Sequence, residues 1–144
     1  MAPFITLLSA FALLRIGGLA GWEYMNSWHS ALQGAVAAML LLTASAHWGA
    51  RRPDLIRMMP ASLPRPELLV IVTGWLEIIG AISILIDGLS FPASIGLAVL
   101  FVAMFPANIR AARERLTIAG KPTPSLPVRT VLQLVFIAAV LLAG

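Results

Sequence analysis

The stretch Phe91–Asn108, which reads FPASIGLAVLFVAMFPAN, contains no charged residue. A helix needs about 20 apolar residues to cross the hydrocarbon core of a bilayer, with a lower limit near 17. The apolar positions here run on continuously, whereas the strands of a membrane barrel would alternate apolar and polar residues. The stretch therefore predicts a transmembrane helix.

Four further apolar stretches of similar length lie around this one, at residues 4–21, 30–48, 67–86 and 127–144. Over the 144 residues, 60% are hydrophobic and only 11% are charged, against roughly 25% charged residues in an average soluble domain. So few polar residues cannot cover the exterior of a soluble domain. We therefore predict one all-α membrane domain over residues 1–144, a compact bundle of about five transmembrane helices in a lipid bilayer.

Two connections, residues 49–66 and 110–126, carry most of the positive charge. Nine of the ten basic residues lie in or beside them, and these are Arg51, Arg52, Arg57, Arg65, Arg110, Arg113, Arg115, Lys121 and Arg129. Basic residues in short loops favour the cytoplasmic side of a membrane. This pattern predicts a cytoplasmic N-terminus and a periplasmic or extracellular C-terminus. Attraction to anionic lipids accounts for the net charge of +4, so no nucleic-acid partner is expected.

Arg15 and Glu77 are the two charged residues well inside predicted helices. A charge at the centre of a membrane helix costs roughly 2.5–3.5 kcal/mol on insertion scales, so each is expected to have a partner or a function. Both helices start from the same face, which places both residues near mid-membrane at ~1.5 Å per residue. The sequence predicts that they face each other or share a polar cavity. They are then either a buried ion pair that fixes helix packing or a ligand or proton site.

A second polar group is predicted near the cytoplasmic surface. His47 and Asn108 end two helices there, and Gln133 lies in the first part of the last helix. These side chains could hold a quinone carbonyl or a lipid headgroup by hydrogen bonds. Pro106, two residues before Asn108, is expected to free a backbone carbonyl and form one wall of such a pocket. The alternative, which the residue types favour, is that these groups only satisfy helix ends and one another.

The chain has no cysteine, which excludes a disulfide, a thiolate metal site and a redox thiol of its own. Its two histidines, His29 and His47, lie at opposite ends of one predicted helix, ~27 Å apart, so they cannot hold one haem. We therefore expect no cofactor of the chain's own and no metal site, and consider a bound quinone or lipid instead.

Four spaced motifs resemble those of the DoxX-like family of small bacterial membrane proteins. Residues 59–67 (MPASLPRPE) are similar to that family's VP-x-x-LP-x-P loop, and Thr73–Glu77 (TGWLE) to its SG-x-x-E segment. Residues 105–109 (FPANI) match its FPANI segment, and 129–133 (RTVLQ) resemble its RLPLQ segment, with Thr130 in place of leucine and no proline after it. His47 falls where the family usually has a histidine at a helix end.

This resemblance covers the chain from about Ala31 onward, so it implies a four-helix DoxX-like core with the helix of Arg15 added in front. It also implies a bacterial inner-membrane protein, since relatives include a subunit of a thiosulfate:quinone oxidoreductase. We accordingly expect an accessory or binding subunit of a quinone-linked redox system, with a membrane oxidoreductase or a second copy of the chain as partner, and no catalytic activity of its own. The alternatives are a quinone- or lipid-modifying enzyme using Glu77 and a small transporter or proton pathway.

Overall fold

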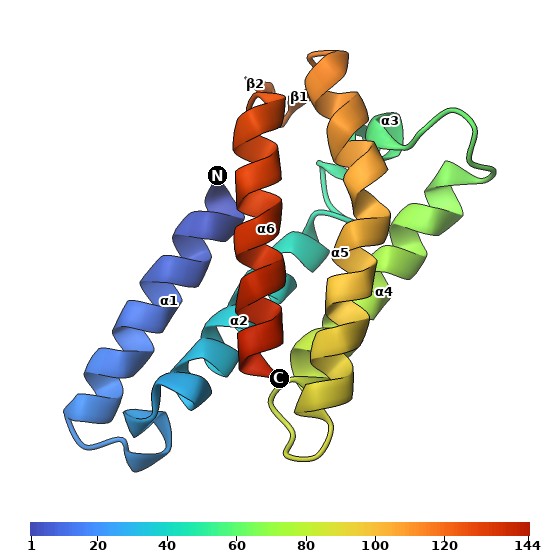
Figure 1. The fold of residues 1–144 in the computed structure, drawn as a ribbon. Coiled ribbons are helices and arrows are strands. Elements are labelled where there is room, and N and C mark those ends of the chain that lie inside the picture. The colour runs from blue at the N-terminus through green and yellow to red at the C-terminus, as the bar shows by residue number, and fades with distance from the viewer.

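The computed structural model describes residues 1–144 and is all-helical apart from one short hairpin (Figure 1). Five long helices account for most of the chain. Its elements in order are α1 (Ala2–Leu19), η1 (Glu23–Asn26), α2 (Trp28–Ser45), α3 (Arg52–Met58), α4 (Pro66–Ser83), α5 (Ser90–Arg113), β1 (Thr117–Ile118), β2 (Lys121–Pro122) and α6 (Leu126–Ala143).

The five predicted apolar stretches correspond to α1, α2, α4, α5 and α6, each of which begins one or two residues earlier than predicted. The largest difference is at the end of α5, where the helix continues past Asn108 to Arg113. Pro106 lies inside this helix without ending it. A proline is tolerated in a membrane helix because neighbouring groups can satisfy the freed backbone carbonyl. The charged residues after Asn108 extend α5 beyond its apolar part.

Four helices, α1, α4, α5 and α6, are long and apolar enough to cross a membrane. The chain is therefore a membrane protein with at least these four candidate spans. The fifth predicted span, α2, is also 18 residues long but contains several polar residues, among them Gln33 and Thr43. Eight of its 18 residues are buried, more than in any other helix. Because its neighbours cover it, α2 needs less apolar surface than a helix that faces lipid.

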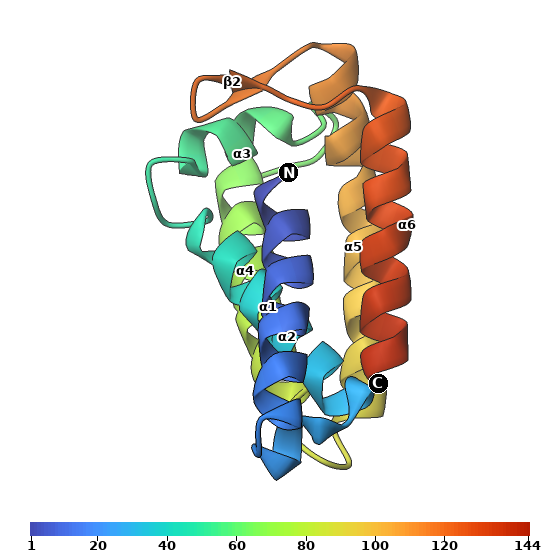
Figure 2. The same ribbon diagram turned by 90° about the vertical axis from the view of Figure 1, so that its left-hand side faces the viewer.

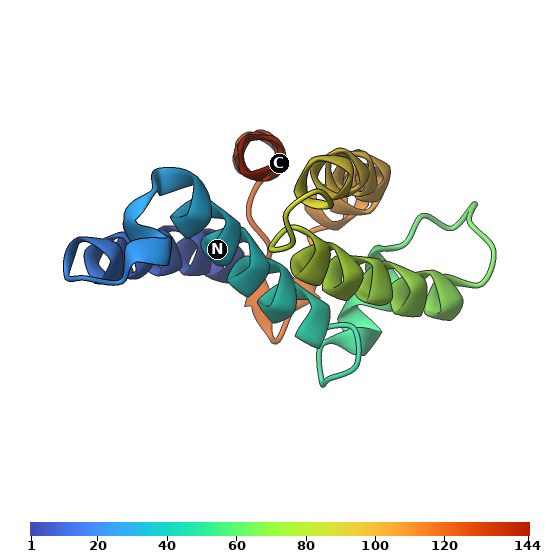
Figure 3. The same ribbon diagram turned by 90° about the horizontal axis from the view of Figure 1, so that it is seen from below.

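The long helices form two layers (Figures 2 and 3). One layer holds α1, α2 and α4 side by side with α2 in the middle, and the other holds α5 and α6. α2 packs against α1, α4 and α6, and α5 packs against α4 and α6. The main core accordingly forms around α2. Its largest fully buried side chains are Val36, Met39, Leu40, Ile84 and Val140.

The basic connections form a compact cap at one end of the bundle, where α3, β1 and β2 gather (Figures 1 and 2). The backbone N–H of Ala119 in the hairpin turn donates to Asp54 Oδ2 of α3 at 3.0 Å. A small second core joins these elements to the end of α5. It contains Met58, Ala107 and Ala111, with Leu55, Met59, Leu116 and Ile118 packed against it. The nine basic residues named above therefore lie at the same end of the molecule.

The opposite end is held by polar contacts between α2 and the end of α6. Gln33 Nε2 donates to the carbonyl of Ala143 at 3.0 Å, and His29 Nε2 lies 3.1 Å from the carbonyl of Gly144. Both carbonyls lie at the C-terminal end of α6, where the helix itself offers no donor to them. Trp22, Tyr24 and Trp28 are exposed at this end, as expected of an aromatic belt at a membrane surface.

Candidate functional site

Glu77 is the most deeply buried charged side chain, with 2% of its surface exposed. It lies on the face of α4 that packs against α2. Its Oε2 accepts a hydrogen bond from the hydroxyl of Thr43 of α2 at 2.7 Å, and its Oε1 lies 3.6 Å from Nε2 of His47. A buried carboxylate is costly unless hydrogen bonds or an opposite charge compensate it. Here Thr43 and His47 supply that compensation.

His47 follows α2 in the turn that leads to α3, and only 4% of its surface is exposed. Its Nδ1 lies 2.6 Å from the carbonyl of Val70 on α4. Because a carbonyl can only accept, the network assigns a hydrogen to Nδ1. The other ring nitrogen, Nε2, is then the one that faces Glu77. His47 and Glu77 together hold either a charged imidazolium–carboxylate pair or a neutral pair with the proton on Glu77.

Gly74 makes this approach possible. A Cβ at position 74 would lie 2.8 Å from His47 Cβ, 2.9 Å from His47 Cγ and 2.9 Å from the ring of Trp48. Only a glycine lets the turn after α2 lie so close to α4. Trp48 also packs edge-to-face on Trp75, with ring centroids 5.5 Å apart, and both indoles are exposed on the bundle surface. The buried pair thus lies next to a surface aromatic pair.

A second polar group joins α5 to α6 near the cap. Asn108 Oδ1 accepts from Arg129 Nη1 at 2.7 Å, and Asn108 Nδ2 donates to Gln133 Oε1 at 3.5 Å. The amide of Gln133 also donates to the carbonyl of Phe101. Both amide side chains therefore have protein partners. Arg129 also belongs to this group, although it was not predicted as a member. The polar groups here satisfy one another's hydrogen bonds, which is the alternative to a ligand pocket that the sequence also allowed.

The predicted pairing of Arg15 with Glu77 is not found in the structure. Arg15 and Glu77 do not pair, because α2 lies between α1 and α4 (Figure 3). Arg15 is also only four residues before the end of α1, and its guanidinium donates to the carbonyl of Asn26 in η1. It therefore holds the α1–η1 corner and is not at mid-membrane.

His47 also lies apart from the amide group that it was predicted to join. α2 ends well short of the cap end of α5 and α6 (Figures 1 and 2), so His47 lies deeper in the bundle, alongside Val70 and Glu77. Asn108 and Gln133 do meet, as predicted. Pro106 is exposed and lines no site with them. Pro106 has no N–H to donate to the carbonyl of Val102, four residues before it. Gln133 donates instead to the neighbouring carbonyl of Phe101.

Thr43 and Thr73 also belong to this site, although neither was predicted as a site residue. The hydroxyl of Thr73 lies 3.4 Å from His47 Nδ1 and donates to the carbonyl of Leu69 at 2.9 Å. A signal was present, because Thr43 precedes His47 by four residues and Thr73 precedes Glu77 by four. Residues four apart share a helix face, so each threonine marked the polar face of its segment. No group of three or more His, Asp or Glu side chains that could hold a metal ion occurs in the chain.

A family model matches residues 36–143, well over half of the chain, and describes the family as a domain of unknown function (DUF8561). The chain belongs to this family. No curated protein and no solved structure matches it significantly. The DUF8561 segment begins inside α2 and contains α3 to α6.

The boundaries of the DUF8561 segment separate Arg15 from Glu77. Thr43, His47, Gly74 and Glu77 all lie within residues 36–143, whereas α1 with Arg15 lies outside. The buried His47–Glu77 pair is thus built entirely from the family segment. The helix α1 packs onto α2 from outside that segment.

Proposed function

We propose that this protein is a DoxX-like accessory subunit of a quinone-linked redox system in a bacterial inner membrane, and that it binds a quinone headgroup next to His47 and Glu77. One observation carries the proposal. These two side chains are almost fully buried, and His47 Nε2 faces Glu77 Oε1 at 3.6 Å. Because the carbonyl of Val70 accepts from Nδ1, Nε2 is the ring nitrogen that can exchange a proton with Glu77.

Quinone chemistry fits this arrangement. A quinone carbonyl accepts hydrogen bonds and takes up a proton when the ring is reduced, and His47 and Glu77 are groups that can donate one. The indoles of Trp48 and Trp75 offer apolar faces beside them, on which a planar ring can stack. The chain itself has no cysteine, so in this proposal the electrons come from a partner oxidoreductase.

The proposal includes a specific orientation. With the basic cap in the cytoplasm, the N-terminus is cytoplasmic and the Glu23 and Asp87 connections face the periplasm. All five long helices then cross the membrane, including α2, which is shielded from lipid on several sides. Cysteine labelling at Arg113 and Asp87 from the two sides of intact inner-membrane vesicles tests this arrangement.

The binding proposal is tested with a short-chain ubiquinone such as decylubiquinone. Added to the protein in nanodiscs, it should quench the tryptophan fluorescence in a saturable way. Glu77→Gln keeps the size of the side chain but removes its charge and its exchangeable acidic proton. Because a hydrogen bond to a charged group contributes about 1.5–3 kcal/mol, the affinity should fall about tenfold or more.

The matched control is Glu67→Gln, the same change on an exposed residue of the same helix, and it should leave binding unchanged. Equal affinities for wild type and Glu77→Gln, or quenching that never saturates in the wild type, would refute the proposed site. Copurification of a quinone or an oxidoreductase with the wild-type protein would support the accessory role.

A second candidate function is proton transfer by Glu77, in an enzyme or a proton pathway. It is favoured by the same contact, because His47 lies on the cap side of Glu77 and could pass a proton toward it. Proton flux into proteoliposomes that depends on Glu77 would favour this candidate. Flux that is the same with Glu77→Gln would remove it.

A further inference from the structure

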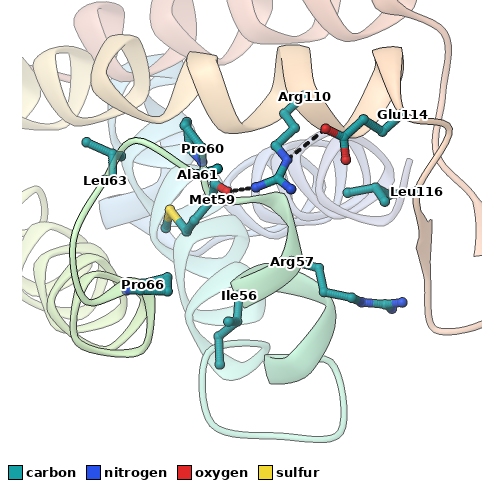
Figure 4. A pocket seen from close by; sticks show the side chains of 10 residues that line it. All are labelled: Ile56, Arg57, Met59, Pro60, Ala61, Leu63, Pro66, Arg110, Glu114 and Leu116. Atoms are coloured by element: carbon teal, nitrogen blue, oxygen red, sulfur yellow. Dashed lines mark hydrogen bonds and ion pairs between the residues drawn. The ribbon is translucent and has the colours of Figure 1, made fainter.

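A hollow of about 410 Å³ opens at the basic end of the molecule, between α3, the 59–65 connection and the end of α5 (Figure 4). Leu63 and Pro66 lie on one side of it and Arg57 and Glu114 on the other, with Arg110 between. Its full lining is Ile56, Arg57, Met59, Pro60, Ala61, Leu63, Pro66, Arg110, Glu114 and Leu116. The lining is thus apolar next to the start of α4 and charged away from it.

Arg110 has hydrogen-bonding capacity left for a ligand. Its Nε donates to Glu114 Oε1 at 3.0 Å, and one N–H of Nη1 donates to the carbonyl of Met59. A guanidinium has five N–H donors, so three remain without a protein acceptor. The two existing bonds hold the guanidinium over the hollow. A phosphate is the kind of group that such a fixed fork of donors binds in pairs.

The excess of positive charge around the hollow favours an anionic ligand. Besides the nine basic residues, this end carries three of the six acidic residues, Asp54, Glu67 and Glu114. Nine minus three leaves six surplus positive charges. Such a surface attracts the anionic lipids of the adjoining leaflet. The apolar side of the hollow adjoins Pro66, the first residue of the candidate span α4, where the hydrocarbon begins.

We propose that this hollow binds one anionic phospholipid. The phosphate is held by the free donors of Arg110, with Arg57 at the rim, and an acyl chain runs over Leu63 and Pro66 toward the bilayer. The lipid would link the 59–65 connection to α5 and so fix the cap. Neither His47 nor Glu77 lines the hollow, so the lipid would bind whether or not a quinone is present.

Native mass spectrometry of the purified protein in detergent tests the site. Phosphatidylglycerol is titrated against phosphatidylcholine and the bound lipids are counted. One phosphatidylglycerol should bind with a clear preference, and Arg110→Gln should weaken it about tenfold or more. Arg113→Gln, the same change on an exposed residue outside the hollow, should change the affinity by less than about twofold.

A third variant keeps the test decisive even if Arg110→Gln fails to fold, because it should strengthen lipid binding. Glu114→Gln keeps Arg110 and removes the carboxylate that competes for it, so phosphatidylglycerol should bind more tightly. Three results would overturn the proposal: equal weakening by Arg110→Gln and Arg113→Gln, no preference over phosphatidylcholine, or complete displacement of the lipid by inorganic phosphate at equal concentration.

Discussion

Replacing Glu77 with leucine should destabilise the protein by about 3 kcal/mol. Removing one partner of a buried ion pair typically costs 3–5 kcal/mol, because the other charge stays buried and uncompensated. His47 can escape part of this cost by losing its proton, which places the expectation at the lower end. Thr43 also loses its acceptor at Glu77 Oε2 but keeps the carbonyl of Leu40, 3.0 Å from its hydroxyl. Unfolding in a denaturing detergent, followed by tryptophan fluorescence, measures the effect.

The double variant Glu77→Leu/His47→Leu separates a charge effect from a packing effect. Buried ion pairs replaced on both sides by apolar residues of similar size are often neutral or more stable. We therefore expect the second substitution to restore most of the stability lost in the first. Leu76→Ala, on an exposed position next to Glu77, controls for changes on α4. The single variant His47→Leu completes the comparison. If the stability lost in the double variant equals the sum of the losses in Glu77→Leu and His47→Leu, His47 and Glu77 do not interact and the pair is not an ion pair.

The helices were predictable because lipid imposes a simple rule on sequence. A spanning segment must be apolar over its whole length, so the stretches that became α1, α4, α5 and α6 stand out without knowledge of their packing. α2 also stands out by length, but it contains Gln33, which is buried, and Thr43, which is half-buried and donates to Glu77 of α4. Hydropathy identifies the segments that can face lipid. It does not show which helices are neighbours, so the place of α2 between α1 and α4 could not be predicted.

The candidate site was only half predictable. Glu77 and His47 were both singled out, but they were assigned to different groups because depth was counted along straight, parallel helices. The real α2 ends early relative to α5 and α6, so the turn with His47 enters the bundle. Helix tilt is set by side-chain packing between neighbours, and a residue count from one end carries no record of it. Arg15 was placed too deep because α1 ends at Leu19, only four residues after it.

Gly74→Ala should destabilise the protein and separate His47 from Glu77. The added methyl would lie 2.8 Å from His47 Cβ, an atom fixed to the backbone, so the turn after α2 must move. Overpacking of this kind costs about 1–3 kcal/mol, although alanine regains up to about 1 kcal/mol as a better helix former. We expect a lower melting temperature, changed Trp48 and Trp75 fluorescence, and weaker decylubiquinone quenching.

Gly96→Ala is the matched control, since a Cβ at position 96 of α5 has no neighbour within 4 Å. It should be neutral or slightly stabilising. Gly80→Ala provides the second comparison, because its Cβ would collide with Leu97 Cδ2 of α5 and would not meet His47 or Trp48. It should lower stability without changing quinone quenching. If Gly74→Ala instead behaves like Gly80→Ala in both measurements, the close approach at Gly74 serves packing only, and the geometry of His47 and Glu77 is not what the quinone recognises.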